Sequence, residues 1–126
     1  MTWTAEQLAT IAAASEIDIA PRHPDDRLGP ATTIWIVRVG DDLYVRSYRG
    51  PAGRWYRNAV RTHEGRIHPG DFERDVTFDE HHGPDHAAVD AAYRAKYGNS
   101  SYVDAMVTPD AAATTLRVLP LQRKEP

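Results

Sequence analysis

Alternating apolar and polar residues between positions 32 and 48 limit the possible folds more than any other part of the sequence. The run Thr32–Val39 has apolar residues on both faces, which predicts a strand that is at least partly covered on each side. Gly40-Asp41 is typical of a tight hairpin turn with glycine in the first position. The alternation resumes over Asp42–Tyr48. The segment therefore predicts an antiparallel β-hairpin.

The remaining elements favour a small antiparallel barrel of the α+β class. Further strands are predicted over residues 16–20, 65–68, 72–78 and 115–121, which gives six with the two of the hairpin. Helices are predicted over residues 4–15, 54–62, 84–97 and 101–106. Because strands and helices do not alternate regularly, a doubly wound parallel sheet is disfavoured. We expect a six-stranded, mainly antiparallel barrel with flanking helices.

Length and composition indicate one domain in a reducing compartment. The 126 residues are predicted to form a single domain, residues 1–126. The absence of cysteine excludes thiol nucleophiles, thiolate zinc sites and iron–sulfur clusters. The N-terminus carries a helix-capping pattern from Thr4 to Gln7 and no basic leader, so we expect a helix there and not a signal peptide. No apolar run is long enough to span a membrane, and the expected location is cytoplasmic.

The segment from Tyr44 to Thr62 is the strongest indication of a binding site. It is rich in arginine and contains no acidic residue, although the chain has a formal net charge of −3. Aromatic residues are interleaved with the arginines, and a glycine-containing loop at residues 50–53 separates the strand from the next helix. Arginine binds phosphate or carboxylate, aromatic faces stack on flat heterocycles, and loop or helix-start amides bind anions. The segment therefore predicts a site for a small, planar, anionic ligand. The acidic remainder of the chain disfavours a nucleic-acid partner.

The sequence resembles a bacterial family that is catalogued as a domain of unknown function. The resemblance rests on the runs IWIVRVGDDLYVRSYRG, RWYRNAV and DAAYRAKYG-NSSY and on a closing VLPL, and YVRSYRG followed by RWYRNA is its most specific part. More distantly, the order of elements is similar to that of the deazaflavin-dependent nitroreductases, which have a flavin-binding split β-barrel. The matching positions are Ser47, Gly50, Trp55, Tyr56 and Asn58. This resemblance implies a split barrel and a homodimer with the cofactor in a groove shared by two subunits.

The same resemblance implies that FMN or a deazaflavin cofactor binds at the loop and the helix start. Arg46, Arg49 and Arg54 are then expected to hold its phosphate or another acidic group. Ser47 and the amides of residues 50–53 are expected to lie beside that group.

The ring of the cofactor is expected to lie against an aromatic residue. Tyr48 or Trp55 is expected to stack on the ring or to form a wall beside it, and Tyr56 is expected to be the catalytic proton donor. An alternative for Trp55 and Tyr56 is that they anchor the helix to the barrel. The expected cofactor-binding residues are Arg46, Ser47, Tyr48, Arg49, Gly50, Gly53, Arg54, Trp55 and Asn58.

A second cluster, from Asp79 to His86, contains several potential metal ligands, His81, His82 and His86 among them. Its spacing matches no known ligand motif, and Pro84 interrupts the helix that would align the last two histidines. A polar loop leading into a helix explains the same residues. We expect no metal site there.

Two hypotheses about function follow. The leading one is a dimeric split-barrel protein that binds a flavin or deazaflavin and reduces small organic molecules. The alternative is a non-catalytic module that binds a small anionic metabolite at Arg46, Arg49 and Arg54. A single-stranded nucleic-acid binder with stacking aromatic residues is a weaker possibility.

Overall fold

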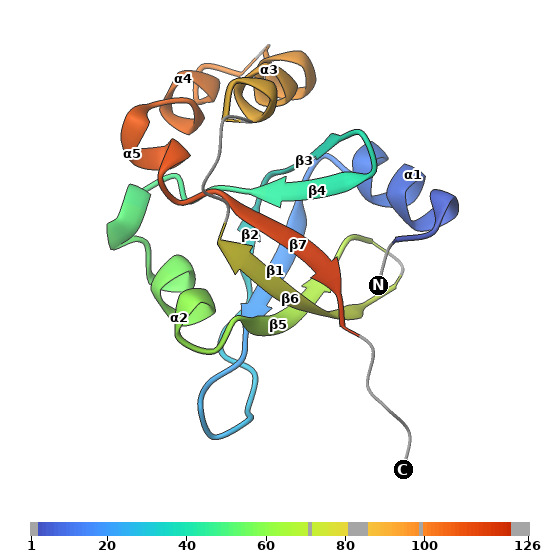
Figure 1. Ribbon diagram of the computed structural model, residues 1–126, viewed down its shortest axis with the longest axis vertical. Coiled ribbons are helices and arrows are strands. Elements are labelled where there is room, and N and C mark those ends of the chain that lie inside the picture. The colour runs from blue at the N-terminus through green and yellow to red at the C-terminus, as the bar shows by residue number, and fades with distance from the viewer. Residues whose placement is uncertain (1–2, 71, 81–85, 99, 122–126) are drawn as a thin grey trace.

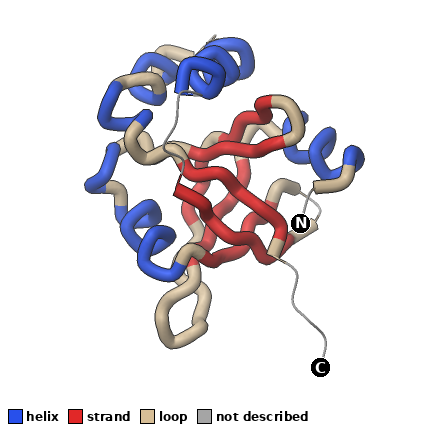
Figure 2. The backbone as a smooth tube through the Cα atoms, viewed as in Figure 1, coloured by secondary structure: helices blue, strands red, loops and turns tan. Residues whose placement is uncertain are grey.

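The computed structural model describes residues 3–70, 72–80, 86–98 and 100–121, and its strands form one seven-stranded antiparallel sheet. The order across the sheet is β2-β1-β5-β6-β7-β4-β3. The sheet curves into a nearly closed barrel with helices around it (Figures 1 and 2). The strands are β1 (Ile17–Pro21), β2 (Thr32–Ile34), β3 (Ile36–Val39), β4 (Asp42–Val45), β5 (Glu64–His68), β6 (Arg74–Glu80) and β7 (Leu116–Pro120).

The barrel closes through a single strand that changes its neighbour at Trp35. β2 and β3 stand at opposite ends of the strand order, yet only Trp35 separates them in the chain. The first half of the expected strand, Thr32–Val39, pairs with β1, and the second half pairs with β4. The α+β class and the antiparallel barrel are therefore confirmed, and the expected six strands become seven because one of them is divided.

The hairpin between β3 and β4 has the expected turn but a shorter second strand. Gly40 has a φ of 62°, which suits the first position of such a turn. β4 ends at Val45, so the expectation of a strand as far as Tyr48 is wrong for residues 46–48. Those residues leave the sheet and lead into a 3₁₀ turn that begins at Gly50.

The helices lie on the outside of the barrel. In Figure 1, α3, α4 and α5 lie beyond β3 and β4, whereas α2 and α1 flank opposite sides of the barrel. α5 was not expected, since a helix of four residues has no measurable periodicity; it begins at Pro109 with Thr108 as its N-cap. None of the helices among the described residues is long and apolar enough to cross a membrane. Their bounds are α1 (Ala5–Ala13), α2 (Arg54–Thr62), α3 (His86–Tyr97), α4 (Val103–Met106) and α5 (Pro109–Ala112).

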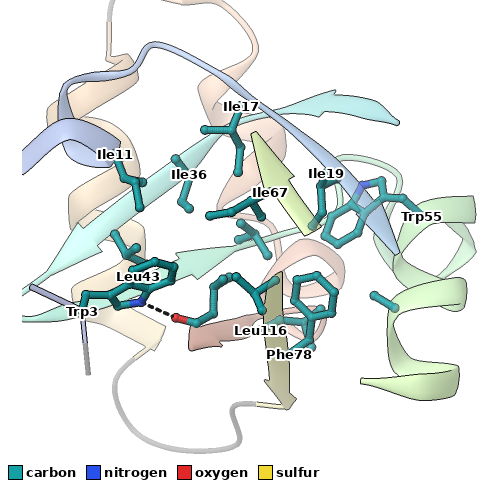
Figure 3. Close-up of a cluster of buried hydrophobic side chains, with 14 of the residues drawn as sticks. Trp3, Ile11, Ile17, Ile19, Ile36, Leu43, Trp55, Ile67, Phe78 and Leu116 are labelled. Atoms are coloured by element: carbon teal, nitrogen blue, oxygen red, sulfur yellow. Dashed lines mark hydrogen bonds between the residues drawn. The ribbon is translucent and has the colours of Figure 1, made fainter. Parts of the chain in front are cut away.

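The N-terminal helix is held in place at its first turn. The Thr4 hydroxyl accepts from the Gln7 amide at 3.1 Å, and the Gln7 side chain accepts from the Thr4 amide at 2.9 Å. The expected capping box is therefore present. The indole of Trp3 donates to the carbonyl of Val118 at 2.8 Å, which attaches this end of the chain to β7 (Figure 3).

Apolar residues pack on both faces of the hairpin, as the alternation predicted. Leu43 and Val45 belong to the cluster inside the barrel, part of which is drawn in Figure 3. Tyr44 and Val37 belong to a second cluster, between the outside of the barrel and α3. The face that carries Tyr44 is thus an internal surface between two layers.

Candidate functional site

The barrel opens where the hairpin separates. β3 and β4 pair Ile36 with Val45, and an extension of this register would place Trp35 opposite Arg46 and Ile34 opposite Ser47. The extension does not form, because β2 turns to β1 while the chain after β4 turns toward Gly50. The two arms form a fork, and we use this name for residues 32–35 and 46–49 together.

A cavity of about 520 Å³ lies between the arms of the fork. Beyond the fork, its walls come from the start of α2 and from the segment that contains α4. Its lining consists of Thr32, Thr33, Ile34, Trp35, Arg46, Ser47, Tyr48, Arg49, Gly53, Arg54, Trp55, Tyr102 and Met106.

Arg46 has a different role from the expected one. Its side chain is 0 % exposed, and its guanidinium forms an ion pair with Asp90. It also donates to the hydroxyl of Thr115 at 2.9 Å, to the carbonyl of Met106 at 2.9 Å and to that of His86 at 3.3 Å. With most of its donors engaged by the protein, this guanidinium is not available as the main group that binds an external anion. The expectation for Arg46 is corrected: it holds the fork to α3 and α4.

Ser47 contributes a buried hydroxyl that has no partner within the part of the chain described. Its backbone is fixed, because its amide donates to the Thr114 hydroxyl at 2.8 Å and its carbonyl accepts from the Gly50 amide at 3.0 Å. A Cβ atom on Gly53 would lie only 2.2 Å from the Ser47 oxygen. Glycine at the N-cap of α2 therefore makes room for this hydroxyl beside the start of the helix.

Arg49 and Arg54 supply the free positive charge of the cavity. Both are exposed, and neither forms an ion pair with any carboxylate among the described residues. Gly53, the N-cap of α2, has no capping side chain, so the first amides of the helix are open. The positive end of the helix dipole lies here as well. Arg49, Arg54, Ser47 and Gly53 all line the cavity, and guanidinium groups, hydroxyls and helix-start amides are the kinds of donor that bind an oxyanion.

Trp35 forms an aromatic wall of the cavity and is held in place by a neighbouring ring. Its ring is stacked on Tyr97 with 4.0 Å between centroids and 2° between planes. The hydroxyl of Tyr97 is fixed in turn, since it donates to the carbonyl of Ser15 at 2.8 Å. Tyr48 and Tyr102 are 55 % and 60 % exposed and meet edge to face at 6.0 Å, where both line the cavity.

Three of the expected site residues do not line the cavity. Gly50 has a φ of 66° and is packed against Asp110, so its role is to form the turn. Asn58 lies further along α2. Tyr56 packs against the cluster inside the barrel, and both burial and the charge of Glu80 raise the pKa of its hydroxyl. Because Tyr56 lies outside the cavity lining and packs inside the barrel, the alternative of a helix anchor is favoured over the role of proton donor.

Trp55 lies at the boundary between the cavity and the cluster inside the barrel. It is 8 % exposed and packs in the cluster inside the barrel, yet it also lines the cavity. Its buried position favours a wall over a stacking surface.

Several lining residues were missed by the sequence analysis, namely Thr32, Thr33, Ile34, Trp35, Tyr102 and Met106. Residues 32–35 read as ordinary strand residues, and only an extension of the hairpin register opposite residues 46–49 could have identified them. No local pattern indicates that α4 reaches the cavity. In the cluster from Asp79 to His86, residues 81–85 lie outside the described residues; elsewhere in the described chain no group of three or more potential metal ligands occurs.

One protein family and several solved structures are similar to this chain. The model of a family described as "uncharacterized protein conserved in bacteria (DUF2255)" matches residues 7–118. No curated protein matches the sequence.

Solved structures share the fold at low identity. HutZ, a heme storage protein from Vibrio cholerae, is 13 % identical with a TM-score of 0.64, and the match covers 98 % of this chain and 93 % of that one. An F420 reductase is 16 % identical with a TM-score of 0.57, over 90 % of this chain and 92 % of that one. A FAD and heme binding protein from Mycobacterium smegmatis is 16 % identical with a TM-score of 0.56, over 94 % of this chain and 65 % of that one. The fold is therefore that of split-barrel proteins, several of which are named for a planar cofactor.

Proposed function

The chain belongs to this bacterial DUF2255 family, and we propose that it binds a flavin or deazaflavin cofactor in the fork and reduces small organic molecules. The observation that carries the proposal is the combination of an anion site and an aromatic wall in one cavity. Arg49, Arg54 and the Ser47 hydroxyl lie on one part of its lining, and Trp35 lies on another. The cavity volume of about 520 Å³ is within the range of roughly 300–1,000 Å³ that is typical of small-molecule sites.

The residues present fit the acidic group of such a cofactor. A phosphate at the start of α2 would accept from the helix amides and from the Ser47 hydroxyl, which lacks a partner among the described residues. Arg49 and Arg54 would add charge-assisted hydrogen bonds. These groups would bind the phosphate of FMN and the charged tail of a deazaflavin equally well, because they recognise negative charge and not the ring.

The ring would lie against Trp35, whose orientation is fixed by the stack on Tyr97. A bound flavin or deazaflavin supplies hydride transfer, and the protein supplies position and electrostatics. The chain's own residues then orient the ring, exclude water and provide a proton. Tyr48 and Tyr102 are the tyrosines of the cavity lining, and we assign the proton donor to this pair in place of Tyr56.

A homodimer belongs to the same proposal. Tyr48 and Tyr102 are the large apolar side chains most exposed among the described residues, and both lie at the cavity. A second copy of the chain packed over them would cover the ligand and exclude water from it. The proposed setting is the cytoplasm.

Titration of the purified protein with FMN and with a deazaflavin, followed by cofactor fluorescence, tests the proposal. We expect binding that weakens about tenfold or more when Arg49 and Arg54 are both changed to Ala, since each loses a charge-assisted bond. The matched control is Arg57→Ala with Arg61→Ala, two exposed arginines of α2 outside the cavity lining. No binding of either cofactor by the wild-type protein, or equal losses in both double variants, would contradict the proposal.

The non-catalytic module remains the second candidate, because the anion site is complete without any ring. It predicts that a small phosphate- or carboxylate-bearing metabolite binds at Arg49 and Arg54 while neither flavin nor deazaflavin does. A heme titration belongs in the same experiment, since two of the solved structures of this fold are named for heme.

A further inference from the structure

The hydrogen bonds of β1 show in which direction the backbone N–H and C=O groups of each β2 residue point. The amide of Arg22 donates to the carbonyl of Glu64 at 2.8 Å, at the position that continues the register between β1 and β5. In an antiparallel pair, the residues that exchange hydrogen bonds alternate with residues that face the other way. Counting back from Arg22, every second residue of β1 faces β5. Ile17 and Ile19 alternate with these residues, so their backbone groups point toward β2.

The backbone N–H and C=O of Thr33 are the groups of β2 that point away from the neighbouring strand β1. Ile17 and Ile19 pair with Ile34 and Thr32, so these two residues turn their backbone groups toward β1. Thr33 lies between them, and the same alternation turns its N–H and C=O to the opposite edge. That edge is the inner side of the fork, where Thr33 lines the cavity.

The other free edge of this strand supports the assignment. Ile36, two residues after Ile34, faces the same side as Ile34 but lies beyond the end of β1. Its carbonyl accepts from Lys96 at 2.7 Å, and its N–H donates to the Tyr97 hydroxyl at 3.3 Å. Side chains of α3 thus provide hydrogen-bond partners for the backbone on the side of the strand opposite the fork.

The inner edge at Thr33 has no such cover. The Thr33 side chain is engaged elsewhere, since its hydroxyl donates to Asp18 at 2.7 Å. Outside the sheet ladder, no hydrogen bond to the Thr33 backbone occurs within the residues described. An adjacent donor and acceptor therefore point into the cavity.

We propose that the Thr33 N–H and C=O recognise the lactam or imide edge of a planar heterocycle, and so select flavin-type rings. This inference rests on the proposed function and adds the chemistry by which the ring is chosen. A cyclic amide presents its C=O and N–H side by side in one direction, which complements the N–H and C=O of one extended residue. The pyrimidine end of flavins and deazaflavins carries such an edge around N3, whereas the rim of a porphyrin has none. A single free residue is too short to add a strand from another protein.

The ligand side of the test uses FMN and its N3-methyl derivative with the wild-type protein. Methylation removes the N3–H donor and leaves the phosphate and the ring in place. We expect the methylated ligand to bind about tenfold more weakly, because it loses its hydrogen bond to the Thr33 carbonyl. Equal or tighter binding of the methylated ligand overturns the inference and leaves the proposed function intact.

The protein side of the test uses Thr33→Pro, which removes the N–H of Thr33. Proline is tolerated on an edge strand when its nitrogen faces away from the neighbouring strand. The control Thr33→Val keeps the backbone and loses only the hydroxyl bond to Asp18. We expect Thr33→Pro to bind FMN about tenfold more weakly than Thr33→Val does, because it loses the hydrogen bond from the N–H to the ring carbonyl. Both variants should still prefer FMN to its N3-methyl derivative, because both keep the Thr33 carbonyl.

Each other outcome decides the question as well. If Thr33→Pro folds and binds FMN as tightly as Thr33→Val, the inference is overturned. If circular dichroism shows that Thr33→Pro is unfolded, the comparison of the two ligands in wild-type protein and Thr33→Val decides alone. If wild-type protein binds neither FMN nor a deazaflavin, the proposed function fails and this inference fails with it.

Discussion

At the scale of single residues, the site depends on small groups as much as on charged ones. Gly53 has no side chain, and this lets the Ser47 hydroxyl lie next to the first turn of α2. Ser47 itself is fixed through its backbone by Thr114 and Gly50. The hydroxyl is therefore placed before any ligand arrives, which lowers the ordering cost of binding.

Gly53→Ala is expected to destabilise the protein by about 1–3 kcal/mol, since the new methyl group overlaps the Ser47 oxygen. Ser47→Ala in the same chain should restore most of this loss, because the remaining neighbours of that methyl group, the Gly50 carbonyl oxygen and the Ser47 Cβ, both lie at 3.4 Å. A double-mutant cycle in urea measures the coupling between the two positions. Strictly additive effects would show that the two residues are not in conflict.

At the scale of elements, the fork is held open by contacts from α3 and α4. Tyr97 of α3 stacks on Trp35 and binds the carbonyl of Ser15, so it fixes one arm. Arg46 fixes the other arm, through Asp90 of α3 and the last carbonyl of α4, that of Met106. The helices beyond β3 and β4 thus determine the width of the cavity.

Arg46→Ala is expected to lower the free energy of unfolding by about 3 kcal/mol or more, because it leaves Asp90 and buried carbonyls without their partner. Asp90→Asn should cost less, since the Asp90 side chain is 37 % exposed and water can replace part of the interaction. Urea unfolding followed by circular dichroism measures both, with Arg57→Ala as a surface control within about 0.5 kcal/mol of wild type. If Arg46→Ala is as stable as the wild type and loses only ligand binding, Arg46 binds the anion and does not mainly hold the fork.

At the scale of the whole molecule, α3 makes stability depend on alkaline pH in two opposite ways. Burial lowers the pKa of Lys96 to about 8 and raises the pKa of Tyr97 to about 12. Burial also raises the pKa of Tyr93. For Lys96 the unfolded chain holds its proton to higher pH than the folded one, and for the tyrosines the folded chain does.

Stability should therefore rise between about pH 8 and 10, as folded Lys96 loses a proton that the unfolded chain retains. Above about pH 10 it should fall, because the tyrosines ionise in the unfolded chain before they do so in the folded one. Urea midpoints at pH 7.5, 9.5 and 11 test both directions. Lys96→Met should abolish the rise and keep the fall. A rise that persists in this variant must come from other groups.

The local elements were predictable because they depend on neighbours in the sequence. The capping box at Thr4, the turn at Gly40 and the helix Arg54–Thr62 follow from side chains a few residues apart. The resemblance added the split barrel, which the comparisons confirm. Within the arginine-rich segment, however, sequence could not distinguish Arg46 from Arg49 and Arg54, because the partners of Arg46 lie 40 or more positions away.

The sequence by itself determined the hairpin, the helix after the glycine loop, and the concentration of arginine and aromatic residues between them. Only the tertiary structure decided that the hairpin separates at Trp35, that Arg46 turns inward and that Thr33 lines a cavity. The physical reason is that alternation fixes which face of a strand is apolar, whereas the neighbour on each edge depends on segments far along the chain. For this protein, the candidate site lies where one strand changes from the first of those neighbours to the second.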